Sequence, residues 1–221
     1  MRRSLLILFL SGLLGGCASL FNGLGNLGGG ATVSGKVWVP QDQKAAIYMG
    51  NAYRINATIP GEVVLGGASV QAYDSSGATE GAAVTSGSDG SFELTGIPIG
   101  KGSFLTATAK TQSGGTLTIT AFLKASSASE VRDINTASTV VAEKLRSSLS
   151  ATKLDGLSQT DIDALEGMVA ANMDTADIPD LTVSGAALTS FNTIMSKSTQ
   201  VASSFQTIAG TTTAALTQSV P

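Results

Sequence analysis

Residues 83–109, AVTSGSDGSFELTGIPIGKGSFLTATA, decide the fold class of this chain. Apolar and polar residues alternate in short runs, and a glycine or proline turn closes each run. Such period-two alternation is typical of strands with one buried face. Ser88-Asp89-Gly90 predicts a hairpin turn, because Asp-Gly supplies the positive φ that tight turns need, and Ile97-Pro98-Ile99-Gly100 predicts the next turn. We therefore predict a β-sandwich, with Phe92 and Phe104 as inward residues of adjoining strands.

The same pattern extends on both sides of this stretch. Glycines in Ser113-Gly114-Gly115 predict a hairpin between the strands at 103–110 and 116–123. Together the runs predict strands at residues 31–39, 68–73, 82–85, 91–94, 103–110, 116–123 and 131–134. The expected architecture is mainly β, an antiparallel immunoglobulin-like or prealbumin-like sandwich with an α-helical appendage.

Several spaced segments resemble the core of carboxypeptidase regulatory-like domains, which are prealbumin-like sandwiches related to the B-type repeats of collagen adhesins. The likeness covers residues 31–135 and implies a fold that usually has no catalytic activity. It is carried, in order, by Ser34–Val37, Gly67–Asp74, Ser88–Phe92, Leu94–Pro98 and Gly100–Phe104.

The resemblance to adhesin repeats also raises the question of an internal Lys–Asn isopeptide bond. Such a bond needs a lysine, an asparagine and a buried glutamate that promotes the reaction. Lys36 on the first strand and Asn135 after the last strand match the lysine and the asparagine. The strand at 103–110, where the family carries the promoting glutamate, has no acid. Without a buried acid the amine and the amide stay unreactive, so we expect no such bond.

The first 16 residues resemble a bacterial lipoprotein signal peptide. Arg2 and Arg3 give a positive start, Leu5–Leu14 is an apolar run too short to span a membrane, and small residues precede Cys17. We predict cleavage before Cys17 and acylation of its thiol with fatty acids such as palmitate. A plain secretory signal and a buried free thiol are the alternatives. Ala18, rather than Asp, follows the cysteine, which favours the outer membrane.

Two segments are predicted to lie outside the regular strands, one that links the anchor to the sandwich and one that is inserted into the sandwich. Residues 17–30 contain the lipidated cysteine and a glycine-rich tether, and residues 41–66 form a long insertion. Long loops of sandwich folds are where binding surfaces tend to lie. Tyr48, Tyr53 and Arg54 are therefore the candidate contact surface, the alternative being that they cover an edge of the sandwich.

After residue 135 the apolar residues recur with a helical period, which predicts a small helical unit over 136–210 and a flexible tail over 211–221. Ser158 is predicted to cap the second of three helices, with Asp161 in a capping-box position. The three apolar stripes are Val141, Leu145 and Leu149; Ile162, Leu165, Met168, Val169 and Met173; and Leu188, Phe191, Ile194, Met195, Val201, Phe205 and Ile208.

The composition excludes most common catalytic chemistry. The chain has no histidine and a single cysteine, which removes Ser-His-Asp and Cys-His catalysis and every zinc site that needs histidine. Asp161, Asp163 and Glu166 are predicted to form a solvated helix face rather than a calcium or acid–base site. Asp74 and Asp89 are interpreted as turn residues. We predict no enzyme activity, no cofactor and no metal.

These features together predict a lipid-anchored, non-catalytic module of the bacterial cell envelope, on its periplasmic or surface side. Its partners would be the membrane, through Cys17, and another envelope protein. A carbohydrate-binding module is the alternative function, although aromatic residues make up only 5% of the chain. The formal net charge of −3 and the lack of clustered Lys and Arg argue against nucleic acid.

Overall fold

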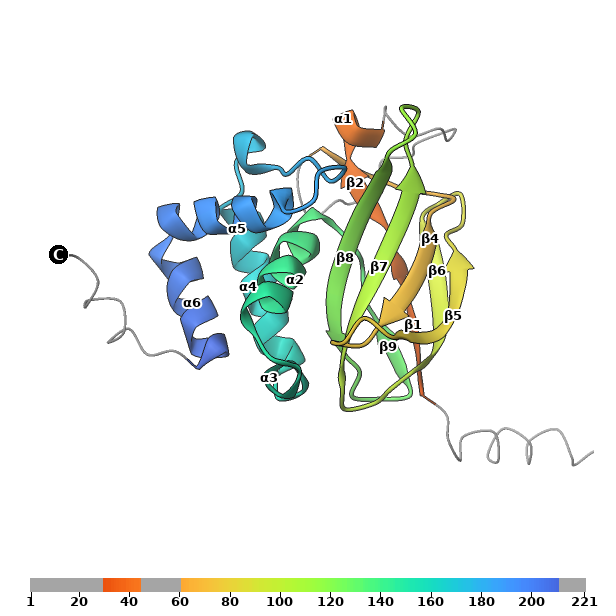
Figure 1. Cartoon of the computed structure of the whole chain (residues 1–221), viewed down its shortest axis with the longest axis horizontal. Coiled ribbons are helices and arrows are strands. Elements are labelled where there is room, and N and C mark those ends of the chain that lie inside the picture. The colour runs from red at the N-terminus through yellow and green to blue at the C-terminus, as the bar shows by residue number, and fades with distance from the viewer. Residues whose placement is uncertain (1–29, 45–60, 211–221) are drawn as a thin grey trace, which may run out of the picture.

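The computed structural model describes residues 30–44 and 61–210. Figure 1 shows strands gathered on one side of the molecule and most helices on the other. The strands are β1 (Ala31–Lys36), β2 (Trp38–Pro40), β3 (Glu62–Val64), β4 (Ser69–Tyr73), β5 (Thr79–Thr85), β6 (Ser91–Ile97), β7 (Gly102–Lys110), β8 (Thr116–Lys124) and β9 (Ser129–Val131). The helices are α1 (Gln41–Lys44), α2 (Thr136–Ser148), α3 (Ala151–Asp155), α4 (Gln159–Ala171), the 3₁₀ turn η1 (Thr175–Asp177), α5 (Ala186–Lys197) and α6 (Thr199–Ala209).

The strands form a sandwich, as predicted. One sheet has the order β5-β4-β7-β8, a second has the order β6-β1-β9, and β2 pairs with β3. All the pairings between these strands are antiparallel except that of β1 with β9, which is parallel. The predicted fold class, a mainly β sandwich followed by helices, is confirmed.

The turn at 88–90 joins the two sheets and is not a hairpin. β5 pairs with β4 while β6 pairs with β1, so the chain changes sheets between them. Gly90 has a φ of +77°, and a Cβ there would lie 3.0 Å from the Val37 carbonyl oxygen. The Asp-Gly pair forms a tight turn, as predicted. It connects strands of two different sheets, and Gly90 packs closely against Val37 there. The predicted hairpin at 113–115 is confirmed by the β7–β8 pairing.

Alternate side chains of both sheets meet in an aliphatic inner core. Phe92, on β6, is 6% exposed and belongs to this core, as predicted. Burial of such side chains supplies the main favourable free energy of folding. Its other large members are Val33, Val37, Val39, Val63, Leu65, Val70, Leu94, Ile97, Leu105, Leu117, Ile119, Leu123, Ile134 and Leu181.

Phe104 faces the opposite way from its predicted direction. It lies on β7, in a different sheet from β6, and its side chain is on the outer face with Phe122 of β8. The two rings pack edge to face with centroids 5.4 Å apart, and both side chains are fully buried. Leu105 occupies the inner position instead. The prediction was wrong because helices bury the outer face as well, so an apolar residue is acceptable on either side.

The helices form an outer core on that second face. Side chains from α2 to α6 surround Phe104 and Phe122, and Figure 1 shows α2 lying beside β8. The larger residues that join the two phenylalanines are Val140, Val141, Leu145, Leu154, Leu157, Ile162, Leu165, Val169, Phe191, Ile194, Val201 and Phe205. Most residues of the predicted apolar stripes therefore belong to this core or pack against it, as expected, whereas Leu188 is half-buried outside it.

Two details of the helical prediction are wrong. The long third helix is two helices, because Ser198 ends α5 and its side chain accepts a hydrogen bond from Val201 N at the start of α6. Ser158 precedes α4 but makes no side-chain capping hydrogen bond. The capping box of the helical unit lies at the start of α2. The Asn135 side chain accepts from Ser138 N, and the Ser138 hydroxyl accepts from Asn135 N.

The helical unit also covers the free edge of β8. Thr118 N donates to Leu181 O (3.1 Å), Thr120 N to the Thr139 hydroxyl (3.0 Å) and Lys124 N to the Gln159 side chain (2.8 Å). An exposed edge strand invites pairing with another chain. These contacts therefore close the sheet on the side where the helices pack.

Candidate functional site

Two adjoining hollows lie on the outer face of the β5-β4-β7-β8 sheet, and a third adjoins them beside the β7–β8 turn. The middle one, of about 380 Å³, lies between β8, α2 and the 180–185 loop. It shares Asp180 and Thr182 with a hollow of about 390 Å³ beside α1 and the β7–β8 turn. It shares Arg146 with a hollow of about 410 Å³ over Tyr73 and Thr106. We call this row of hollows the trough.

Threonine side chains of β8 form the floor of the middle hollow. Thr116, Thr118 and Thr120 alternate with buried residues and so point to the same outer face. Thr106 of β7 lies opposite Thr120, and their hydroxyl oxygens are 3.3 Å apart. Lys110 lies opposite Thr116 and donates a hydrogen bond to its hydroxyl at 3.0 Å. The floor therefore carries threonine hydroxyl groups, of which Thr118 is exposed while Thr120 is buried.

Helix α2 supplies a charged wall. Arg146 is in the last turn of α2, and its guanidinium carbon lies 4.3 Å from the centre of the Phe104 ring. A guanidinium over an aromatic face is held there by the ring quadrupole. Glu143, one turn earlier, pairs with Arg146 at 3.3 Å. Phe104 is buried, so its ring holds the Arg146 guanidinium at a fixed place above the outer core. The Arg146 side chain is 42% exposed and faces the trough.

Hydrogen-bonded turns lie along the trough, one at Asp180, which lines two of the hollows, and one at Asp74, which lines the third. Asp180 accepts hydrogen bonds from the backbone N–H and hydroxyl of Thr182, which lower the pKa of its carboxyl. Asp74 accepts from the Ser76 hydroxyl, Ala78 N and Ser76 N, and its pKa is also lowered, chiefly by the Ser76 hydroxyl. The prediction that Asp74 is a turn residue is confirmed, as it is for Asp89, which binds Ser91 in the same way.

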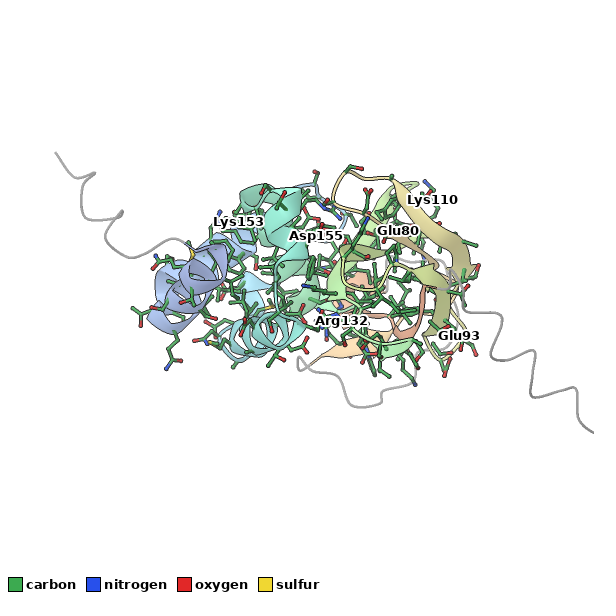
Figure 2. The ribbon with its side chains drawn as sticks, turned by 90° about the horizontal axis from the view of Figure 1, so that it is seen from below. Glu80, Glu93, Lys110, Arg132, Lys153 and Asp155 are labelled. Carbon is green, nitrogen blue, oxygen red and sulfur yellow. The ribbon has the colours of Figure 1, made fainter. Side chains whose placement is uncertain are left out.

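A second charged group lies at the junction of the helices and the sandwich. Arg132 follows β9, and Figure 2 shows it where the helices meet the sandwich. It donates to Glu166 and, at 2.9 Å, to Asp163, both on α4. Arg132 and Glu166 are about 9% exposed. Burial raises the pKa of Glu166 to about 7, although the Arg132 charge acts in the opposite direction. The prediction of a solvated face was wrong for Glu166. Its carboxylate is buried against Arg132, which is 34 positions away in the sequence.

Other predicted residues have different surroundings. Cys17, Tyr48, Tyr53 and Arg54 lie outside the described residues, so the lipidation site and the predicted contact surface stay predictions. Lys36 Nζ lies 3.7 Å from Asp89.

In the described ranges, no three His, Cys, Asp or Glu side chains converge as a metal site would require. Over the same ranges, no helix has the length and apolar character needed to cross a bilayer.

The residues that line the trough were not recognised from the sequence. The Thr116-x-Thr118-x-Thr120 alternation does mark an outward polar face. Nothing in the local pattern, however, places Tyr73 and Arg146 beside it, since they are 73 positions apart in the sequence. Only the packing of α2 on Phe104 brings them together.

Comparisons with known proteins give little further guidance. No family model matches the chain, and no curated protein matches it. Among solved structures, the chain is similar to a double mutant of the shaft pilin SpaA from Lactobacillus rhamnosus GG, with 14% identity and a TM-score of 0.26. The match covers 48% of this chain and 46% of the pilin chain, so this chain spans less than half of that neighbour.

Proposed function

We propose that this protein is a non-catalytic lipoprotein of the bacterial cell envelope that holds a binding surface close to the membrane. Acylated Cys17 would anchor it, favouring the outer membrane, and residues 31–135 would form a sandwich of the carboxypeptidase regulatory-like type. Several acyl chains hold a protein on a bilayer almost irreversibly, whereas one holds weakly. A tether of 13 residues, Ala18–Gly30, reaches about 45 Å at full stretch.

The observation that carries the proposal is the trough. It is framed by β8, by α2 and by the 180–185 loop, which are fixed to one another by the outer core and by the hydrogen bonds along the edge of β8. A preformed surface of this kind suits recognition, because little ordering is needed on binding. Its polar lining groups are hydroxyls and carboxylates with a single guanidinium, beside Leu181, Val183 and Ala187, which suits a mainly polar partner.

The anchor is tested by metabolic labelling with a fatty-acid probe. The full chain should be labelled, and Cys17→Ser should be unlabelled and should accumulate as an uncleaved precursor. Ser19→Ala is the matched control, because it changes a neighbouring small residue and keeps the thiol. A labelled Cys17→Ser protein would reject the anchor.

The binding surface is tested in cells with a photo-crosslinking side chain. Placed at the exposed Thr118 in the trough, it should give adducts with envelope material. Placed at the exposed Glu93 on β6, in the other sheet, it should not. Equal adducts at both positions would show that the trough is not the functional surface.

A further inference from the structure

The trough has the shape of a site for an extended chain. Thr116 to Thr120 alone span about 13 Å at about 3.3 Å per residue. Beyond them the hollows continue toward the β7–β8 turn in one direction and over Thr106 of β7 and Tyr73 of β4 in the other. A compact ligand would fill one hollow. Three hollows that share lining residues fit a linear ligand that lies along the outer face of the sheet.

The lining offers hydroxyl groups, carboxylates and one guanidinium as hydrogen-bonding groups. Each threonine hydroxyl can donate one hydrogen bond and accept two, as can each hydroxyl of a sugar. Glu143 supplies acceptors and Arg146 supplies donors on the opposite wall. Tyr73, half-buried in the last hollow, adds an aromatic side chain with a polar tip, which suits a ligand with apolar and polar faces.

The charge of the trough argues against an anionic polymer. Four carboxylates line it, those of Asp42, Asp74, Glu143 and Asp180, against the guanidinium of Arg146 and the ammonium of Lys110 at the rim. A surface of this sign repels polyanions and does not provide the clustered cations that phosphate recognition needs.

The edge of β8 argues against an extended peptide. Peptides that bind to sheets commonly add a strand and use the free backbone groups of an edge. On β8 the N–H groups of Thr118, Thr120 and Lys124 already bind Leu181, Thr139 and Gln159. The trough therefore presents side-chain hydroxyl groups to a ligand rather than an open backbone ladder.

We infer that the trough binds a linear, uncharged oligosaccharide, with Thr118 and Tyr73 among the residues that contact it. The inference rests on the proposed function, because it names the partner class of the same envelope-anchored surface. It places carbohydrate recognition on β4, β7, β8 and α2, and not on the predicted contact residues Tyr48, Tyr53 and Arg54.

The test is calorimetric titration of the full chain in a detergent without a sugar head group. The probes are three neutral linear hexasaccharides, cellohexaose, maltohexaose and hexa-N-acetylchitohexaose, with hexagalacturonate as an anionic chain of equal length. A hexapeptide of Ser, Gly and Asn is the peptide probe. At least one neutral hexasaccharide should bind, and the anionic chain and the peptide should bind more weakly or not at all.

Two variants then locate the site. Thr118→Val removes one exposed hydroxyl with little change of shape, and Tyr73→Leu removes the ring; each should raise Kd about fivefold or more, as loss of one or two hydrogen bonds or packing contacts does. The controls are Thr95→Val, an exposed threonine of β6 in the other sheet, and Tyr48→Leu in the insertion, and neither should change Kd by more than about twofold. Circular dichroism confirms that every variant is folded.

The inference is overturned if none of the neutral hexasaccharides binds, or if the anionic chain or the peptide is preferred. It is also overturned if binding survives both trough variants or is lost in Tyr48→Leu. These outcomes differ from a failure of the proposed function, which fatty-acid labelling and crosslinking at Thr118 measure independently of any sugar.

Discussion

The two faces of the β5-β4-β7-β8 sheet are buried by different means. The inner face is covered by the second sheet and is mainly aliphatic, with Leu105 and Ile119 as examples. The outer face is covered along β7 and β8 by helices that follow in the sequence, around the phenylalanine pair Phe104 and Phe122. Strand alternation assigns a residue to one face, but it does not say whether the other face is buried too. The local sequence therefore encodes the alternation of faces, whereas long-range packing decides whether each face is buried.

The largest expected effect comes from emptying either core. Phe104→Ala in the outer core and Phe92→Ala in the inner core should each lower the free energy of unfolding by about 3–5 kcal/mol, since each leaves a cavity among buried side chains. If the two cores form one cooperative unit, Trp38 fluorescence and helical circular dichroism will shift together in both variants. The control is Ile99→Ala at a 47% exposed position, which should change little. An unchanged midpoint in Phe104→Ala would show that the outer core contributes nothing to stability.

The junction ion pair should give the next largest effect. Arg132→Ala leaves Glu166 buried without its cation and should cost about 3 kcal/mol at pH 8, measured by chemical denaturation. The double variant Arg132→Met with Glu166→Gln removes both charges, so its cost should be smaller than that of the single variant. A double variant as unstable as Arg132→Ala would mean that Arg132 acts through packing alone.

Glu166 should also make stability depend on pH. Its pKa is about 7 in the folded protein and 4.5 when unperturbed, so the folded state binds this proton more tightly. The resulting stabilisation is fully present below about pH 4.5 and is lost as the pH rises through 7, on the order of 1–3 kcal/mol in total. Denaturation midpoints at pH 5, 6, 7 and 8 should fall along this series in the natural protein and stay flatter in Glu166→Gln. Identical slopes in the two proteins would refute the assignment to Glu166.

The smallest expected effect is a difference in stability between variants at the starts of α2 and α4. Asn135 is buried and caps α2 with its side chain, so Asn135→Ala should cost about 1 kcal/mol. Ser158 makes no capping hydrogen bond, so Ser158→Ala should change stability by less than about 0.5 kcal/mol. Urea denaturation of the two variants measures both values. Equal losses would contradict the difference in capping.

Much of the sandwich was predictable, because strand periodicity and turn chemistry are local. The period-two runs found strands β4, β6, β7 and β8 close to their observed bounds, and Gly114 lies in the predicted hairpin. Sheet membership was not predictable in the same way. The corner at Gly90 and a hairpin have the same Asp-Gly signature, and the long-range pairing of β5 with β4 and of β6 with β1 decides between them.

The candidate site was far less predictable than the fold. Its lining combines Tyr73 of β4, threonines of β7 and β8 and Arg146 of α2. Each of these residues is ordinary in its local segment. Their chemistry depends on proximity, which follows from the packing of α2 on Phe104 and was not visible in spacing or composition.

The sequence by itself determined the sandwich class, the helical unit after residue 135, the turn roles of Asp74 and Asp89, and the exclusion of histidine-based chemistry. These properties depend on neighbours within a few positions, or on composition alone. Tertiary structure decided which face Phe104 occupies, that Arg132 meets Glu166, and that Arg146 lies in a trough. The physical reason is that burial and charge pairing depend on distances in space, and these residues become neighbours only when the helices pack on the sheet.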